Sequence, residues 1–165
     1  MFKKNLLASG FQVRKGWCSF TSMVKRSKLQ IDFEYDFRVL GLIAAVREYK
    51  LAWSLNRHMH WHLIKETDHV LDFKSDQRLV VSHFAFLREH SGFRLLKNRA
   101  VESSGVSKPF LIPERKNYDY WLLVYGDPLE NEFQDLLLQI QALTAVQYIK
   151  EEPLDDLRSK DNFIV

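Results

Sequence analysis

The hydrophobic pattern of the first third of the chain changes from strand-like to helix-like. Apolar and polar residues alternate over residues 29–37, which predicts a half-buried strand. Residues 39–46 are apolar throughout and include Gly41, as expected of a central strand covered on both faces. Residues 47–59 then repeat apolar side chains at helical spacing. The apolar positions of this predicted helix are Tyr49, Leu51, Ala52, Trp53, Leu55 and Met59.

The middle of the chain predicts short strands joined by turns. A short strand is expected near residues 70–73. Residues 78–87 and 93–98 are β-like runs on either side of a polar segment, which predicts a hairpin with Gly92 at its turn. Residues 100–108 contain serines and a glycine and predict a loop.

The last third combines a strand, a helix and a closing strand. Residues 118–125 predict a buried strand. Asp127 is the expected N-cap of the helix that follows, with Pro128 at its first position and Glu130 reaching back as in a capping box. Residues 145–150 predict the closing strand. The apolar stripe of the helix comprises Leu129, Phe133, Leu136, Leu137, Ile140 and Leu143.

The two predicted helices follow similar segments. Tyr-Asp-Phe at residues 35–37 and Tyr-Asp-Tyr at residues 118–120 each precede a short apolar strand and then a helix. Two such units, each followed by strands, predict an α+β fold with an antiparallel (mixed) sheet of about five to six strands. Both helices should pack on one face of this sheet. The closest known arrangement is the ferredoxin-like βαββαβ order with an added hairpin.

The charge of the chain is divided unevenly. No acidic residue precedes Asp32, whereas seven of the 24 Lys and Arg residues do. The remainder carries 17 Lys and Arg against 21 Asp and Glu, a net charge of −4. The basic character therefore belongs to the N-terminal segment, and we expect no nucleic-acid partner because the rest of the chain offers no basic stripe.

The same division predicts three segments. Residues 1–22 form a disordered basic leader, either an organellar transit peptide or sequence upstream of a natural start at Met23. Residues 23–150 form one α+β domain, and residues 151–165 a polar C-terminal tail. No apolar run reaches the roughly 18 residues of a membrane-spanning helix, so we expect no membrane association. The single cysteine, Cys18, excludes an internal disulfide and favours a cytoplasmic location.

The most specific pattern lies at residues 112–120, which read Ile-Pro-Glu-Arg-Lys-Asn-Tyr-Asp-Tyr. This segment resembles the motif of the IPExxxVDY family. Tyr118 departs from the motif because it stands at the valine position. With weaker matches on either side, the resemblance extends over roughly residues 28–149. The residues that match the motif are Ile112, Pro113, Glu114, Asp119 and Tyr120.

The resemblance implies a bacterial protein of the Bacteroidetes group and thereby favours Met23 as the start. The family has no assigned activity, so the resemblance implies no reaction. From the residues themselves, we expect Glu114 and Asp119 to accept hydrogen bonds from backbone N–H groups or an arginine and to hold the loop in register. A catalytic or ligand-binding role for the two carboxylates is the alternative.

A second candidate site is the histidine run His58, His60 and His62. On a helix His58 and His62 would share a face, and on a strand all three would, so the run is a weak candidate for metal binding. It lacks the His-Glu-x-x-His spacing that would add a general base. We therefore expect no metal and no cofactor.

The remaining patterns point away from common enzyme classes. The six glycines form no phosphate-binding loop, and no Gly-x-Ser-x-Gly sequence is present. We expect no catalytic residues and a non-enzymatic protein-interaction module, which acts as a homodimer or with another protein. The alternatives are a small-ligand-binding or regulatory domain and, less favoured, a metal-dependent enzyme that uses His58, His60 and His62.

Overall fold

The computed structural model describes residues 35–73, 77–89, 91–107, 109–126 and 128–164. The leader at residues 1–22, the start at Met23 and most of the strand predicted at residues 29–37 lie outside these residues. The first described strand begins at Phe37, so the apolar run predicted at residues 39–46 corresponds to this strand with earlier bounds.

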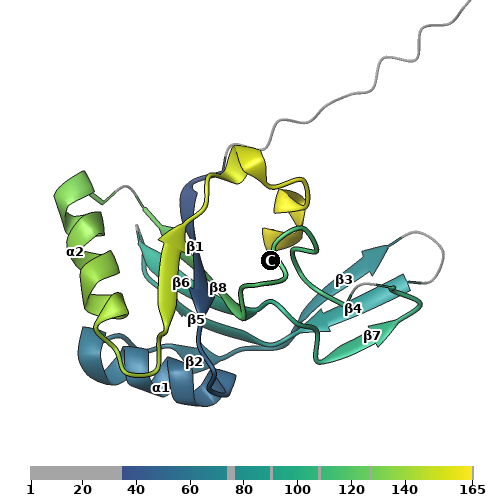
Figure 1. The fold of residues 1–165 in the computed structure, drawn as a ribbon, viewed down its shortest axis with the longest axis horizontal. Helices are drawn as coiled ribbons and strands as arrows, with labels where there is room; N and C mark the ends of the chain where they lie inside the picture. Colours follow the sequence, from purple (N-terminus) through teal and green to yellow (C-terminus); the bar gives the residue numbers. More distant parts are fainter. Residues whose placement is uncertain (1–34, 74–76, 90, 108, 127, 165) are drawn as a thin grey trace, which may run out of the picture. The chain divides into compact units, whose positions relative to one another are not determined.

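A six-stranded antiparallel sheet forms the centre of the fold, in the order β2-β5-β6-β8-β1-β9 (Figure 1). Its strands are β1 (Phe37–Ile43), β2 (Ile64–Lys65), β5 (His83–Leu87), β6 (Gly92–Lys97), β8 (Tyr120–Tyr125) and β9 (Tyr148–Glu151). The helices are α1 (Glu48–Met59) and α2 (Glu130–Gln141). Within the described residues, neither of these helices is long and apolar enough to cross a membrane.

The predicted α+β class is confirmed, and six elements follow the ferredoxin-like order. Along the chain they are β1, α1, β6, β8, α2 and β9, and their strands lie side by side as β9-β1-β8-β6. The added hairpin is β5–β6, in which Leu87 pairs with Gly92. Gly92, predicted at the turn, is the first residue of β6 and pairs with Leu87 on one side and with Tyr125 of β8 on the other.

A second, three-stranded sheet was not predicted. It consists of β3 (His69–Phe73), β4 (Gln77–Val81) and β7 (Glu102–Ser104), in the order β3-β4-β7. The run predicted as one strand at residues 78–87 divides at Ser82, where the chain leaves this sheet and joins the central one. The loop predicted at residues 100–108 contains β7, whose three residues are all exposed and give no apolar signal.

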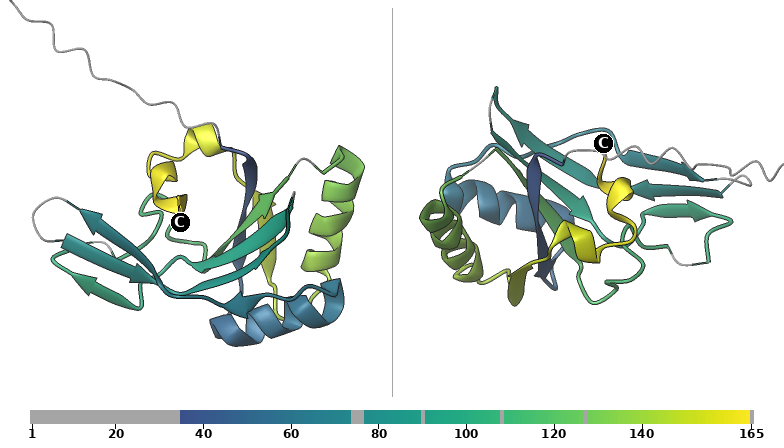
Figure 2. Two further views of the ribbon diagram at one scale, coloured as in Figure 1. Left: turned by 180° about the vertical axis from the view of Figure 1, so that it is seen from behind. Right: turned by 90° about the horizontal axis from the view of Figure 1, so that it is seen from above.

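The two faces of the central sheet carry separate cores because side chains alternate along each strand. One face, here called the helix face, is covered by α1 and α2 (Figure 2). The other, here called the motif face, is covered by residues 109–118 and by the C-terminal turns. Buried residues of the helix face include Leu40, Leu42, Leu122, Leu51, Leu55, Phe133 and Ile140. Those of the motif face include Phe37, Val39, Trp121, Leu123, Leu111, Ile112, Leu157 and Phe163.

The C-terminal segment differs from the polar tail predicted for residues 151–165. After β9 the chain forms two short 3-10 turns, Leu154–Asp156 and Lys160–Phe163, and packs on the motif face. Phe163 is fully buried and contacts the rings of Phe37 and Trp121. The sequence signal was weak because only a few apolar residues are scattered among many charged ones.

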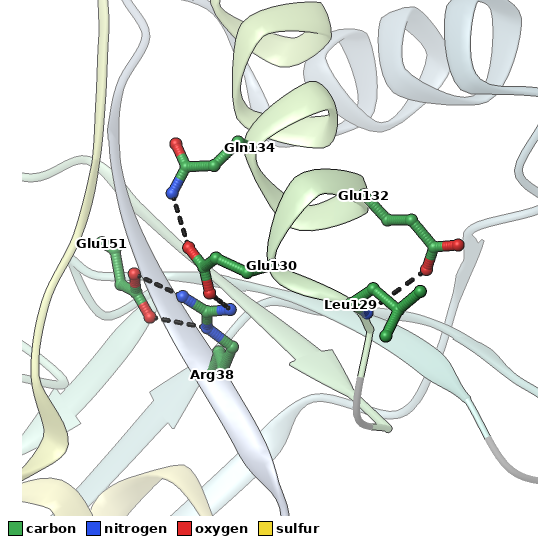
Figure 3. A network of polar contacts seen from close by, with 6 residues as sticks. All are labelled: Arg38, Leu129, Glu130, Glu132, Gln134 and Glu151. Carbon is green, nitrogen blue, oxygen red and sulfur yellow. Dashed lines mark hydrogen bonds and ion pairs between the residues drawn. The ribbon is translucent and has the colours of Figure 1, made fainter.

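The beginning of α2 also differs from its prediction. Asp127, the predicted cap, lies outside the described residues, and Leu129 is the N-cap. The Glu132 carboxylate accepts a hydrogen bond from the Leu129 N–H at 3.3 Å, so Glu130 is not the residue that reaches back (Figure 3). Glu130 instead accepts hydrogen bonds from Gln134 and from Arg38 of β1. The same guanidinium binds both carboxylate oxygens of Glu151 in β9, so it ties α2 to the sheet edge.

Candidate functional site

The family-like motif begins in a loop that is anchored by one buried side chain. Asn98, fully buried after β6, accepts a hydrogen bond from the Ile112 N–H at 3.0 Å. Its amide donates to the carbonyls of Arg115 and Tyr118, at 2.9 and 2.8 Å. A loop over a sheet cannot satisfy its backbone groups internally as a helix does, so a buried amide takes over that function.

Glu114 connects the motif to the C-terminal turns. Its carboxylate accepts hydrogen bonds from the Ser159 N–H at 2.8 Å and from the Ser159 hydroxyl at 3.1 Å. Burial alone would raise the pKa of Glu114, but the hydrogen bonds from Ser159 outweigh it and lower the pKa. The charged carboxylate therefore holds the C-terminal segment against the motif loop.

Asp119 and Tyr120 connect β8 to the segment between β1 and α1. The Asp119 carboxylate accepts a hydrogen bond from the Ala44 N–H at 3.0 Å. The Tyr120 hydroxyl donates to the Val46 carbonyl, just before α1. Asp119 and Tyr120 thus position the chain where it leaves β1. Neither Glu114 nor Asp119 lines any of the four grooves found among the described residues.

Tyr118, which departs from the family motif, lies across Gly41 of β1. A Cβ atom at position 41 would stand 2.8 Å from the Tyr118 ring, so only glycine fits there. The Tyr118 hydroxyl donates to the Glu152 carboxylate at 2.7 Å, and Arg115 and Lys150 form ion pairs with the same carboxylate. Glu152 was not predicted as a partner of Tyr118, because a single glutamate in a charged segment carries no periodic signal.

Glu152 is 5% exposed and charged. Burial acts to raise its pKa, but the hydrogen bonds from Tyr118, Lys150 and Arg115 together lower it. The arrangement consists of one carboxylate with three donors, which hold it in its charged form.

The three predicted histidines do not form a common site. The Nδ1 atom of His58 lies 2.9 Å from the Ser54 carbonyl, one turn earlier in α1. His60 ends the helix in the left-handed conformation, with φ of 54°, and His62 lies beyond it. Within the part of the chain that the structure describes, no three His, Cys, Asp or Glu side chains are grouped to hold a metal ion.

A surface feature that the sequence did not single out lies on α1. We call it the α1 groove; it has a volume of about 630 Å³. Trp53 is 60% exposed and Tyr49 51% exposed, although their helical spacing resembled that of core residues. The helix carries two adjacent rows of apolar side chains. The row with Leu51 and Leu55 is buried, whereas the row with Tyr49 and Trp53 is exposed. The residues that line the groove are Val46, Tyr49, Lys50, Trp53, Ser54, Thr144 and Ala145.

Two basic side chains lie at the α1 groove. Lys50 lines it, and the guanidinium carbon of Arg57 lies 5.3 Å from the centre of the Trp53 ring. Lys50 and Arg57 are both exposed. An exposed Trp and Tyr beside exposed cations form a surface suited to an apolar segment with acidic neighbours.

The outer face of α2 has the opposite charge. Its 12 residues include no Lys or Arg; Glu132 and Asp135 are exposed, whereas Glu130 is paired with Arg38 of β1. Leu138 is 64% exposed on this helix. The two helices that cover one face of the sheet thus present complementary exteriors.

Comparison with protein-family models and with curated proteins finds no match for the chain. The resemblance to the IPExxxVDY family therefore stays a prediction that rests on the motif residues. The geometry assigns these residues to the connections between β1, β8 and the C-terminal turns.

Proposed function

We propose that the protein is a non-enzymatic interaction module of the cytoplasm that associates with a second copy of itself. In this proposal the α1 groove of one copy binds the outer face of α2 of the other. The observation that carries the proposal is the exposure of Trp53 and Tyr49 beside an apolar groove. Large aromatic side chains are enriched at the centres of protein interfaces, where they supply most of the binding energy.

Charge supports a second copy as the partner. The groove is flanked by the exposed cations Lys50 and Arg57, and on α2 the acidic Asp135 lies one turn before the exposed Leu138. A two-fold arrangement would form the contact between α1 and α2 twice, so both exposed surfaces of each copy would be covered. Complementary charges would also set the orientation of the two copies.

The cytoplasmic location is supported by the cysteine content, since the single Cys18 allows no internal disulfide. The non-enzymatic character is supported by the hydrogen bonds of the motif carboxylates, which are directed to backbone and serine groups.

Light scattering coupled to size-exclusion chromatography at several protein concentrations tests the proposal. The mass should rise from 19.6 kDa towards twice that value as the concentration increases. Trp53→Ser should abolish the rise, whereas Val101→Ser, which changes an equally exposed apolar residue elsewhere, should leave it unchanged. A monomer at every concentration would contradict self-association.

A charge exchange identifies the two surfaces. Lys50→Glu alone and Asp135→Lys alone should each weaken the dimer, because each places like charges across the contact. The double variant should recover part of the lost affinity. A double variant weaker than both single variants would show that α1 does not contact α2 of the second copy.

A further inference from the structure

A separate pocket lies on the motif face, at the end of the sheet formed by β2, β5 and β6. Its volume is about 450 Å³. Ile64 pairs with Ala85, and Ala85 pairs with Arg94 in the neighbouring strand. Paired residues of adjacent strands point to the same face of a sheet, so these three side chains form one row across the pocket. Arg94 also pairs with Leu123 of the motif-face core, which assigns the row to that face.

The pocket is lined by a buried histidine whose ring has one unused nitrogen. His83 lies two residues before Ala85 in β5, so its side chain is on the same face of the sheet. The residue is 5% exposed, and its Nε2 atom has no hydrogen-bond partner in the described part of the chain. The ring also forms a hydrogen bond with the backbone of Thr67. Because Nε2 is unpartnered, Nδ1 is the nitrogen that donates this bond.

The protonation state of His83 makes the unused nitrogen an acceptor. Burial, followed by the charges of Arg94 and His69, lowers the pKa of His83 to about 4. The ring is therefore neutral at pH 7, and with its proton on Nδ1 it carries a lone pair on Nε2. A buried acceptor without a donor is costly, so a bound group that donates an N–H or O–H to Nε2 removes this cost.

The charges at the pocket favour a neutral ligand. Glu66 lines the pocket and disfavours anions. The positive charge of Arg94 acts on the His83 ring and disfavours cations at the same place. A ligand that carries a donor but no charge avoids both effects.

The remaining lining offers a second polar group and apolar surface. Thr67 is exposed and lines the pocket, and a threonine hydroxyl can donate to a carbonyl oxygen. Ile64 and Leu87 are about half exposed, at 50% and 51%. A ligand that matches these groups combines an N–H donor, a carbonyl acceptor and an aliphatic part.

We propose that this pocket binds a small neutral amide with an aliphatic ring or chain. The amide N–H donates to Nε2 of His83, and the amide oxygen accepts from the Thr67 hydroxyl. The aliphatic part lies against Ile64 and Ala85. The site is independent of the proposed self-association, because the α1 groove lies on the opposite face of the sheet.

The lactam 2-pyrrolidinone is a suitable probe, with γ-butyrolactone as a compound of the same shape whose ring oxygen replaces the N–H. Titration of the full chain with the lactam, followed through the ring nitrogen signals of His83 in nuclear magnetic resonance spectra, should show saturable binding. The Nε2 signal should change most. The lactone should bind about fivefold more weakly, because it lacks the donor for Nε2.

Two variants and a control locate the site. His83→Asn keeps a donor near the position of Nδ1 and removes Nε2, so it should bind the lactam about fivefold more weakly and the lactone as before. Thr67→Val keeps the side-chain shape and should also weaken lactam binding. His58→Gln changes a histidine on α1 outside the pocket and should leave the affinity unchanged. The backbone amide signal of Ala85 follows binding in all variants.

Circular dichroism checks the folding of each variant. Equal affinity of the unsubstituted chain for the lactam and the lactone, or lactam binding unchanged in both pocket variants, would overturn the assignment. The comparison of the two compounds needs no substitution, so it tests the pocket even if His83→Asn fails to fold. A chain that stays monomeric at every concentration would contradict self-association and leave the lactam titration unaffected.

Discussion

The two faces of the central sheet are covered by different kinds of structure. On the helix face, α1 and α2 satisfy their own backbone hydrogen bonds and contribute apolar stripes. On the motif face, irregular chain lies on Trp121 and Leu123, and buried polar side chains satisfy its backbone. The comparison shows that irregular chain can cover the face of a sheet, provided that specific side chains such as Asn98 replace the missing helical hydrogen bonds.

The largest effect is expected from removing one buried aromatic side chain on each face of the sheet. Phe163→Ala and Phe133→Ala each remove a fully buried ring, and each should lower the free energy of unfolding by about 3–5 kcal/mol. Urea denaturation measures both changes. Val101→Ala, at an exposed position outside both helices, is the control and should change stability by less than about 0.5 kcal/mol. If Phe163→Ala behaved like this control, the C-terminal turns would not be part of the core.

The next effect compares two asparagines that bind loop backbone. Asn98→Ala leaves the Ile112 N–H and two carbonyls without their partner and should cost about 3 kcal/mol. Asn56→Ala, on the helix face, removes two hydrogen bonds with Leu63 at a half-buried site and should cost about 1 kcal/mol. Equal losses in thermal or urea unfolding would argue against a special dependence of the motif face on polar side chains.

A smaller effect tests the close contact between Gly41 and Tyr118. Gly41→Ala places a methyl group against the Tyr118 ring and should cost about 1–3 kcal/mol. Tyr118→Val, which introduces the residue of the family motif, removes the ring and should reduce the additional cost of Gly41→Ala. A double-mutant cycle measures this coupling. Additive effects of the two changes would show that the ring moves aside freely.

The smallest effect is the acid dependence of the motif face. Hydrogen bonds lower the pKa of Glu114 and Glu152 in the folded protein despite their burial. Their stabilisation is therefore fully present above the ordinary glutamate pKa of about 4.3 and is lost as the pH falls through the lower folded values. With Glu152→Gln, the free energy of unfolding should fall less steeply as the pH is lowered from 5 to 3. An unchanged slope would mean that Glu152 is not charged in the folded state.

The helix face could be predicted from the sequence, whereas the motif face could not. The apolar stripes of α1 and α2 and the buried strand β8 have regular periods, and the predicted elements lie close to the observed ones. The period does not, however, say which of two adjacent rows of apolar side chains is buried, so it could not show that Tyr49 and Trp53 are exposed. The position of Leu157 and Phe163 depends on a distant part of the chain and leaves no periodic pattern.

The candidate sites follow the same division. The hydrogen bonds expected of Glu114 and Asp119 to backbone N–H groups are present, because a short connection into a buried strand restricts what a carboxylate there can bind. Glu152, the partner of Tyr118 and 34 positions away, gave no local signal. A pocket lined by Ile64, Ala85 and Arg94 likewise depends on the register of three strands, which the hydrophobic pattern alone does not determine.

The contacts between the beginning and the end of the described chain have a kinetic consequence. The Tyr35 hydroxyl donates to Asp161, 126 positions later, and Phe37 contacts Phe163 nearby. Contacts between residues so distant in sequence form slowly, because a long segment must first be ordered between them. We therefore expect the motif face to close late in folding, after the helices have packed. Phe163→Ala should then accelerate unfolding strongly and change the folding rate little.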